Sequence, residues 1–134
     1  MNLLLDTNVW LLGLLAPERI PPAIRSRLKS GAAGLWISPI TVWEATWLAQ
    51  KGRIRILGSP GDWARAAMAS GPWREAPLTS EIAIQSRAQP IPVEDPADRF
   101  LVATAYVEGF TLVTSDRALA KIPGVSVLAF RPRA

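Results

Sequence analysis

Four acidic side chains stand at or near the ends of apolar runs in this sequence. They are Asp6, Glu44, Asp98 and Asp116. The chain has only eleven Asp and Glu residues, so these four are a large share of them. Carboxylates brought together repel one another and resist desolvation, and a fold that gathers them therefore usually gathers them around a cation. Ligand sets made only of oxygen favour Mg²⁺ or Mn²⁺, so these residues are candidate ligands for such an ion.

The residue types that the chain lacks narrow its chemistry further. It contains no Cys and no His. Disulfides, thiolate zinc sites, iron–sulfur clusters and Cys nucleophiles are therefore excluded. Ser-His-Asp catalysis and metal sites with imidazole ligands are excluded as well. Any catalysis has to use carboxylates, hydroxyls, Lys, Arg and a bound ion.

The charge balance is basic, with fifteen Lys and Arg against eleven Asp and Glu and a net charge of +4. If four acids share one pocket, the rest of the surface is more basic still and suits a polyanion. The pocket itself would repel a polyanion unless a cation were bound. A net charge of +4 is equally consistent with solubility alone, so charge does not select a function.

At 134 residues the chain is expected to form a single domain over 1–134. Hydrophobic residues make up 49% of it, but no apolar run reaches the roughly 20 residues of a membrane span. The first six residues contain neither a basic region nor a long apolar region, so we expect no signal peptide, no membrane association and a cytoplasmic protein. The tail 131–134 is expected to be loose.

The elements that would position the four acids alternate between strands and helices. Strands are predicted at residues 2–5, 35–37, 111–114 and 125–130. Helices are predicted at residues 9–15, 18–29, 39–50, 62–70, 80–87, 96–108 and 117–121. This alternation predicts an α/β fold in which a central parallel sheet is flanked by helices.

The predicted elements place the acids where they can converge. Ligands of open parallel sheets bind at the carboxyl ends of the strands, and both Asp6 and Asp116 fall at such ends. Asp98 falls in the first turn of a helix, where the helix dipole favours a carboxylate. Glu44 lies within the helix predicted at 39–50. We therefore expect one pocket, although each Asp taken alone is more often a turn or cap residue.

Four segments together resemble a known family. They are residues 3–10, residues 37–44 with 51–54, residues 95–105, and residues 112–116. Each segment is a weak signal alone, but all four occur in order and at similar separations over nearly the whole chain. In these features the chain is similar to PIN-domain proteins, specifically to the VapC type of toxin ribonuclease from type II toxin–antitoxin systems.

Two positions depart from the family pattern. Asn8 stands where many relatives carry His, which affects substrate handling at most. An acid that is common in the turn after Asp116 is missing here, which would weaken the binding of a second metal ion.

The resemblance implies a PIN-like three-layer sandwich and metal-dependent hydrolysis of phosphodiester bonds in RNA. Asp6 and Asp98 would hold Mg²⁺ or Mn²⁺ directly or through water, and Asp116 would complete the shell. Glu44 would bind a second ion or orient the attacking water. The resemblance also implies a toxin that inhibits translation or growth, a homodimer, and a cognate antitoxin. The antitoxin would lay an apolar and basic segment along a groove of the toxin, with an Arg reaching the acidic pocket.

Several polar residues near the acids are candidate supports for the site. They are Thr7, Asn8, Asp95, Arg99, Thr114 and Ser115. The hydroxyl and amide side chains among them would donate hydrogen bonds to the carboxylates or to water molecules on the metal. A role limited to forming the turns is equally consistent with the sequence. Asp95 is assigned mainly to capping the helix that presents Asp98. Arg99 would contact phosphate or pair with Asp98, and the ion pair is slightly favoured. The six Trp residues could stack on bases, but most are expected in the core or an interface.

Other functions remain as alternatives. PIN-like folds can also serve as inactive RNA-binding or scaffold modules, but unpaired clustered acids cost stability and argue against this. An RNA-processing nuclease without an antitoxin is a further alternative. A magnesium-dependent phosphatase needs an acid two positions after the first Asp, where this chain has Asn8. A receiver domain needs early paired acids and a Lys after a late strand, and neither pattern is clear.

Overall fold

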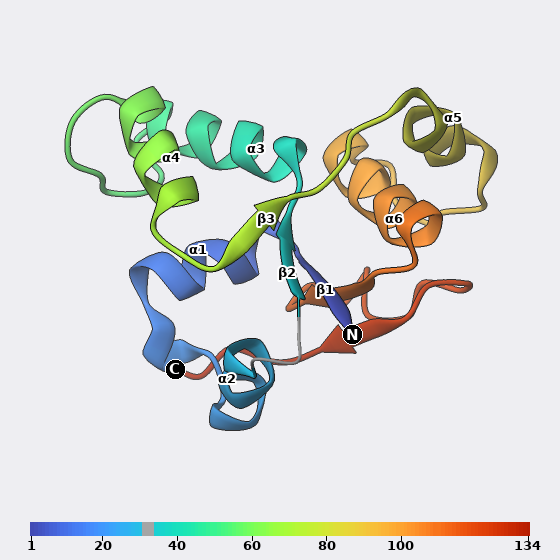
Figure 1. The fold of residues 1–134 in the computed structure, drawn as a ribbon, viewed down its shortest axis with the longest axis horizontal. Coiled ribbons are helices and arrows are strands. Elements are labelled where there is room, and N and C mark those ends of the chain that lie inside the picture. The colour runs from blue at the N-terminus through green and yellow to red at the C-terminus, as the bar shows by residue number, and fades with distance from the viewer. Residues whose placement is uncertain (31–33) are drawn as a thin grey trace.

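A five-stranded parallel sheet forms the centre of the computed structural model, which describes residues 1–30 and 34–134 (Figure 1). The strand order is β3-β2-β1-β4-β5, and all four pairings are parallel. The strands are β1 (Asn2–Leu5), β2 (Gly34–Ile37), β3 (Trp73–Glu75), β4 (Thr111–Thr114) and β5 (Val127–Ala129). Because β1 lies in the middle and pairs with both β2 and β4, the residue that follows it is placed at the centre of one edge of the sheet.

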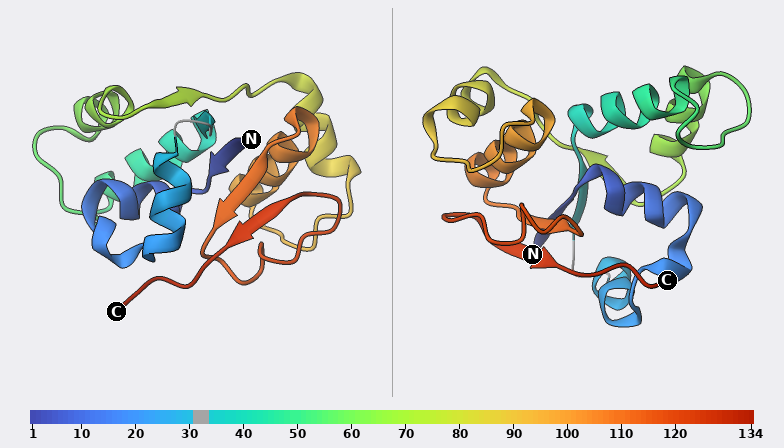
Figure 2. Two further views of the ribbon diagram at one scale, coloured as in Figure 1. Left: turned by 60° about the horizontal axis from the view of Figure 1, so that its bottom comes forward. Right: turned by 180° about the vertical axis from the view of Figure 1, so that it is seen from behind.

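Helices cover both faces of this sheet. They are α1 (Thr7–Leu15), α2 (Pro22–Lys29), α3 (Pro39–Gln50), α4 (Pro60–Ala69), α5 (Ser80–Ala88) and α6 (Pro96–Glu108), with a short 3₁₀ helix η1 (Pro17–Arg19). Figure 2 shows α5 and α6 on the opposite side of the sheet from α1, α3 and α4. The expected three-layer α/β architecture is therefore confirmed.

A hydrophobic cluster packs against each face of the sheet, which explains why the sequence of β1 is a continuous apolar run. Leu3 and Leu5 pack with residues of α1, α3 and α4 on one face. Leu4 packs with Leu101 and Val102 of α6 on the other face. Successive strand residues point to opposite faces, so a strand covered on both sides must be apolar at every position.

The helix starts follow their sequence signals. The side chains of Ser38, Ser59 and Asp95 cap α3, α4 and α6, and each cap is followed by Pro at the first helical position. Gly109 ends α6 with a φ of 72°, in the left-handed region that glycine tolerates best. These local signals fix the point at which α3 and α6 begin, and so where Glu44 and Asp98 are presented.

Several predicted elements differ from the structure. The helix expected at 18–29 is divided into η1 and α2, because Pro21 and Pro22 occupy the N-cap and the first position of α2 and cannot continue a helix from η1. Residues 117–121 form turns and no helix. Here the main-chain N–H groups of Leu119 and Ala120 both bond to the carbonyl of Asp116, and Pro123 follows closely. Strand β3 was not predicted, and β5 is shorter than expected.

The C-terminal tail is bound to the body of the protein, so the expectation of a loose tail is wrong. The N–H of Arg133 donates to the carbonyl of Arg19 at 2.7 Å. The Nε of Arg19 donates in return to the carbonyl of Arg133 at 3.0 Å. Reciprocal bonds of this kind hold an extended tail against η1. Within the described ranges, no helix is long and apolar enough to cross a membrane.

Candidate active site

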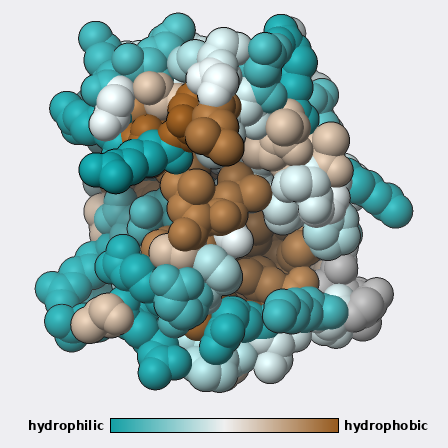
Figure 3. All heavy atoms as spheres, turned by 90° about the vertical axis from the view of Figure 1, so that its left-hand side faces the viewer, coloured by the Kyte–Doolittle hydropathy of each residue, from teal (hydrophilic) through white to brown (hydrophobic). Residues whose placement is uncertain are grey.

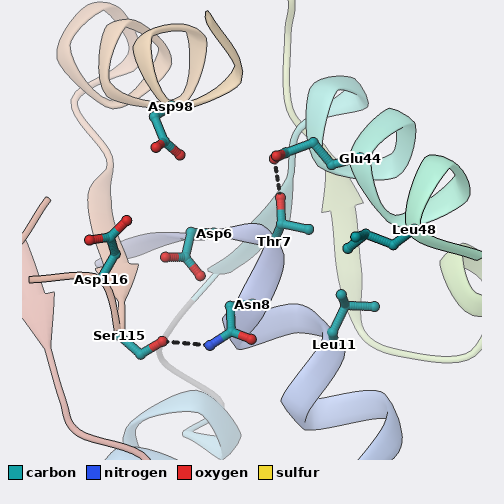
Figure 4. Close-up of a pocket in the computed structure, with 9 residues that line it drawn as sticks. All are labelled: Asp6, Thr7, Asn8, Leu11, Glu44, Leu48, Asp98, Ser115 and Asp116. Carbon is teal, nitrogen blue, oxygen red and sulfur yellow. Dashed lines mark hydrogen bonds between the residues drawn. The ribbon is translucent and has the colours of Figure 1, made fainter. Parts of the chain in front are cut away.

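The four acidic residues surround one pocket of about 390 Å³, and Figure 4 shows their carboxylates directed around the same space. They come from four places in the fold: the end of β1, the middle of α3, the first turn of α6 and the loop after β4. The other lining residues are Thr7, Asn8, Leu11, Leu48 and Ser115. The structure therefore brings together all four acids that were singled out in the sequence.

Asp6 is the most buried of the four, with 5% of its surface exposed. It caps α1, because its Oδ1 accepts from the N–H of Val9 at 2.8 Å. Its Oδ2 accepts a short hydrogen bond from the hydroxyl of Thr114. Burial raises the pKa of Asp6 to about 6, although these two hydrogen bonds pull it down, and the charges of Asp116 and Glu44 add to the rise. A neutralising cation would relieve this cost.

Asp98 is presented by the first turn of α6. Its main-chain N–H donates to Oδ2 of Asp95 at 3.0 Å. Its own carboxylate accepts no hydrogen bond from the residues described. Burial raises the pKa of Asp98 to about 7, and the negative charges of Asp95 and of the other three pocket acids contribute. A cation beside Asp98 would offset both the cost of burial and this repulsion.

Glu44 is half-buried and is tied to the start of α1. Its Oε1 accepts from the hydroxyl of Thr7 at 2.5 Å. Burial is the main cause of its raised pKa, and the charge of Asp95 adds to it. The second oxygen of Glu44 accepts no hydrogen bond from the described residues.

Asp116 is exposed and organises the loop after β4. Its Oδ1 accepts from the N–H of Ala118 at 2.8 Å, and its own N–H donates to the hydroxyl of Thr114 at 3.0 Å. The Thr114 hydroxyl therefore contacts both Asp6 and Asp116. This single side chain sets the relative position of two of the acids.

No cationic side chain balances these acids in the described part of the chain. The one ion pair found there joins Arg65 and Asp62 on the surface of α4. Mutual repulsion keeps unneutralised carboxylates apart. Accordingly, although the four acids line one pocket, no three acidic side chains within residues 1–30 and 34–134 are arranged closely enough to hold a metal ion together. The donors are nevertheless all oxygens, which suits a hard cation such as Mg²⁺ or Mn²⁺.

The supporting residues divide into three groups. Thr7 and Thr114 donate to pocket carboxylates, and Asp95 caps α6, as expected. Asn8 and Ser115 bond instead to each other across the pocket rim, with Nδ2 donating to Oγ at 2.7 Å. They link the start of α1 to the loop after β4 (Figure 4).

The expected ion pair between Arg99 and Asp98 is not present. Only 9% of the surface of Arg99 is exposed, and its guanidinium donates to three main-chain carbonyls. Nε bonds to Ser86 at 2.9 Å, and Nη1 bonds to Ile91 and Val93, each at 2.8 Å. These partners lie near the end of α5 and in the connector between α5 and α6, and Arg99 is not among the residues that line the pocket.

Two apolar lining residues were not predicted. Leu11 lies four residues after Thr7 on α1, and Leu48 lies four residues after Glu44 on α3. Residues four apart share one side of a helix, so the spacing from the polar members could have identified them. They form an apolar wall on one side of the pocket (Figure 4).

Comparisons with known proteins agree with this geometry. The model of the PIN domain family matches residues 3–125, which include all four acids. Ribonuclease VapC22 of Mycobacterium tuberculosis (strain ATCC 25618 / H37Rv) is 31% identical over 119 residues, covering 88% of this chain and 89% of that protein. The structure of VapBC2 from Rickettsia felis, bound to a DNA fragment from its promoter, matches with a TM-score of 0.75 at 14% identity, covering 97% of this chain and 99% of that one. A toxin–antitoxin complex from Klebsiella pneumoniae matches with a TM-score of 0.64 at 26% identity, covering 93% and 94% of the two chains.

Proposed function

Since the chain belongs to the PIN domain family and is related to VapC toxin ribonucleases, we propose that it is a metal-dependent endoribonuclease. We propose further that it acts in the cytoplasm as the toxin of a type II toxin–antitoxin pair that inhibits translation or growth. The observation that carries the proposal is the set of four carboxylates around one pocket with no cationic partner among the described residues. Burying such a set without a cation is unfavourable, and the raised pKa values of Asp6 and Asp98 reflect this.

The donor set suits Mg²⁺ or Mn²⁺, which when bound would activate water and neutralise charge on a phosphate. Asp6 and Asp98 would hold the ion directly or through water. Asp116 would complete the shell, and its position relative to Asp6 is set by Thr114. Glu44, with one oxygen engaged by Thr7, would use its free oxygen to orient the attacking water or to bind a second ion.

The proposed substrate is RNA because the relative that is 31% identical is a ribonuclease and the chain carries a net charge of +4. The acidic pocket takes four of its eleven acids, so the remaining surface is more basic than this net value indicates. A basic surface around a cation-loaded pocket attracts the phosphate backbone from every side.

A second part of the proposal is a cognate antitoxin seated on an apolar groove. A cavity of about 620 Å³ is lined by residues of α1, α2, β2 and β3, among them Val9, Trp10 and Leu28. Figure 3 faces the side of the molecule that carries α1, α2 and α4, and shows a hydrophobic band between hydrophilic margins. In this cavity the buried Nε1 of Trp10 and Nε of Arg25 have no acceptor among the described residues. Val9 and Trp10 are already buried in the lone chain, so a partner segment would cover the outer, partly exposed part of the lining, such as Leu28 and Trp73.

We also propose that the protein is a homodimer, as the family resemblance implies. Exposed apolar side chains outside the pocket and the groove are available for such a contact. They include Leu57, Leu78 and Ile84.

Cleavage of a mixed RNA panel by the purified chain tests the central proposal. The protein is assayed with Mg²⁺ or Mn²⁺ and with chelator, beside Asp6→Asn and the matched surface control Asp62→Asn, whose carboxylate is exposed in the Arg65 pair. We expect cleavage that requires both metal and Asp6 but not Asp62. Full activity of Asp6→Asn, or cleavage in chelator, would contradict the assignment. Metal-independent RNA binding without cleavage by the folded protein would support the inactive-module alternative.

Expression in cells separates a toxin from a processing nuclease. We expect the wild-type chain to arrest growth and Asp6→Asn to permit it. A chain that cleaves RNA in vitro but leaves growth unchanged would support the processing nuclease.

A further inference from the structure

An apolar groove between α3 and α6 lies directly beside the acidic pocket, and the reaction proposed above does not use it. It encloses about 350 Å³ and is lined by Ile40, Trp43 and Trp47 from α3 and by Pro96 and Ala97 from the start of α6. Glu44 lines this groove as well as the acidic pocket. The two spaces therefore meet at the Glu44 side chain, and a molecule whose phosphate enters the pocket would have to pass only this side chain to reach the groove.

The two Trp side chains in this groove are unusually exposed. Trp43 is 60% exposed and Trp47 is 40% exposed. By contrast, Trp10 packs edge-on against Trp73, and Trp36 stacks on Phe110. Neither groove Trp packs against another aromatic ring among the described residues. Large aromatic surface left in water indicates a site that another molecule covers.

Trp43, Trp47 and Lys51 follow one another at intervals of four residues, so they form one stripe along α3 and its C-terminal cap. The ammonium group of Lys51 lies 6.0 Å from the centre of the Trp47 ring. The stripe thus begins beside the catalytic carboxylate and ends at a positive charge. Aromatic faces combined with a nearby cation are the usual means of binding single-stranded nucleic acid.

We propose that Trp43 and Trp47 form a stacking platform for an unpaired base of the RNA next to the scissile phosphate. This inference rests on the proposed ribonuclease function and assigns the side chains that would hold an unpaired base. Bases in a duplex are stacked on each other and cannot reach a protein aromatic, whereas an unpaired base can. The Lys51 ammonium would attract the phosphate beyond that base.

The charges around the groove favour a base over a second copy of the chain. Glu44 and Asp95 both line it, so a phosphate inside the groove would be repelled, whereas a neutral base would not. A two-fold dimer formed through this groove would bring the same patch of both copies into one interface. It would therefore bury Glu44 and Asp95 of both copies, at a desolvation cost, and neither has an ion-pair partner among the described residues.

Binding and cleavage of RNA by Trp variants test the platform. Binding is measured by fluorescence anisotropy of labelled single-stranded RNA with Mg²⁺ in the Asp6→Asn background, and therefore does not depend on cleavage. We expect Trp43→Ala and Trp47→Ala each to raise the Kd about 5- to 150-fold, which corresponds to the 1–3 kcal/mol of one stacked base. Trp43→Phe should recover most of the loss. In the active protein the same changes should raise KM and leave kcat nearly unchanged.

The matched control is Tyr106→Ala, which removes an aromatic side chain of similar exposure (45%) that does not line the groove. It should leave the Kd unchanged. The same RNA presented as a duplex should bind the Ala variants and their parent equally. Wild-type affinity in both Ala variants would overturn the platform, and so would an equal loss for single-stranded and duplex RNA.

Sedimentation of each variant tests the alternative that the groove binds a second copy of the chain. If Trp43→Ala converts a dimer into a monomer, the groove holds a second copy and the platform is overturned. If an Ala variant fails to fold, Trp43→Gln and Trp47→Gln replace it, because both positions are exposed enough to accept a polar side chain. Absence of cleavage by the wild-type chain would refute the ribonuclease function, whereas the anisotropy result alone decides the platform.

Discussion

Asp6 caps α1 and is proposed to hold the metal ion, and substitutions can separate these two roles. Asn at this position keeps an oxygen that can cap α1 at Val9 but removes the buried charge. We therefore expect Asp6→Asn to abolish cleavage while leaving the free energy of unfolding equal or slightly higher. Asp6→Ala also removes the cap and leaves the Thr114 hydroxyl without its acceptor, so it should destabilise by about 1–3 kcal/mol. Urea unfolding measures both, and an Asn variant less stable than the Ala variant would refute this division.

The raised pKa values of Asp98 and Asp6 predict how stability depends on pH in the absence of metal. Their pKa values in the folded protein are about 7 and about 6, against 3.8 for a free Asp. Between pH 4 and 7 the folded state therefore binds more protons than the unfolded state, and the free energy of unfolding falls as pH rises. We expect a loss on the order of 1–2 kcal/mol, reduced by solvent screening at half-exposed Asp98.

Urea unfolding in chelator at pH 5 and pH 7.5 measures this loss. The variant Asp98→Asn should show a shallower pH dependence, because it removes the more strongly shifted group. An unchanged slope in that variant would show that Asp98 is not a source of the effect.

The sequence identified the pocket acids because their role depends on residue type and on position after an apolar run. Arg99 was misassigned because its partners are main-chain carbonyls of Ser86, Ile91 and Val93, which carry no residue-type signal. The contact between Asn8 and Ser115 joins residues 107 apart in the chain, so it depends on how β1 and β4 pair. Local sequence patterns can mark both residues as polar turn residues, but they cannot show that the two bond to each other.

At the scale of elements, Arg99 holds the connector between α5 and α6 in place. The connector ends at Asp95, which caps the helix turn that carries Asp98. Arg99→Met would leave three buried carbonyls without donors, and we expect it to destabilise the fold by about 2–4 kcal/mol. Arg99→Lys should recover little, because an ammonium group cannot reproduce the planar set of donors.

Equilibrium unfolding tests the role of Arg99. The control is Arg65→Met, which removes an exposed Arg from a surface ion pair and should cost less than about 0.5 kcal/mol. A similar small cost for Arg99→Met would mean that the connector is held by its other contacts. Metal titration of the folded variant should then show whether the Asp98 turn has shifted.

Elements with strong local signals were predicted well, and elements defined by their neighbours were not. The starts of α3 and α6 carry Ser-Pro and Asp-Pro signals that define a helix N-terminus by themselves. Strand β3 has three residues, of which Arg74 and Glu75 are exposed, so no apolar alternation marks it. It is a strand because β2 offers it a free edge to pair with.

At the scale of the whole molecule, metal binding should stabilise the fold. The pocket joins β1, α3, α6 and the loop after β4, so an ion held there would connect segments from most of the chain. At 100 times the Kd of Mg²⁺ or Mn²⁺ the gain would be about 2.7 kcal/mol. We expect the melting temperature to rise with either ion in the wild type and in Asp62→Asn, but not in a variant that combines Asp6→Asn with Asp98→Asn. An equal rise in that double variant would place the ion elsewhere.

The central position of β1 also affects when activity can appear during synthesis. β1 emerges first from the ribosome, but its neighbour β4 begins only at Thr111, and the bond between Thr114 and Asp6 spans 108 positions. Chains are made at about 5–20 residues per second, so a growing chain spends most of its synthesis without Asp98 and Asp116, two of the four pocket acids. The proposed ribonuclease would thereby be unable to attack the message that encodes it until almost all of the domain has been made.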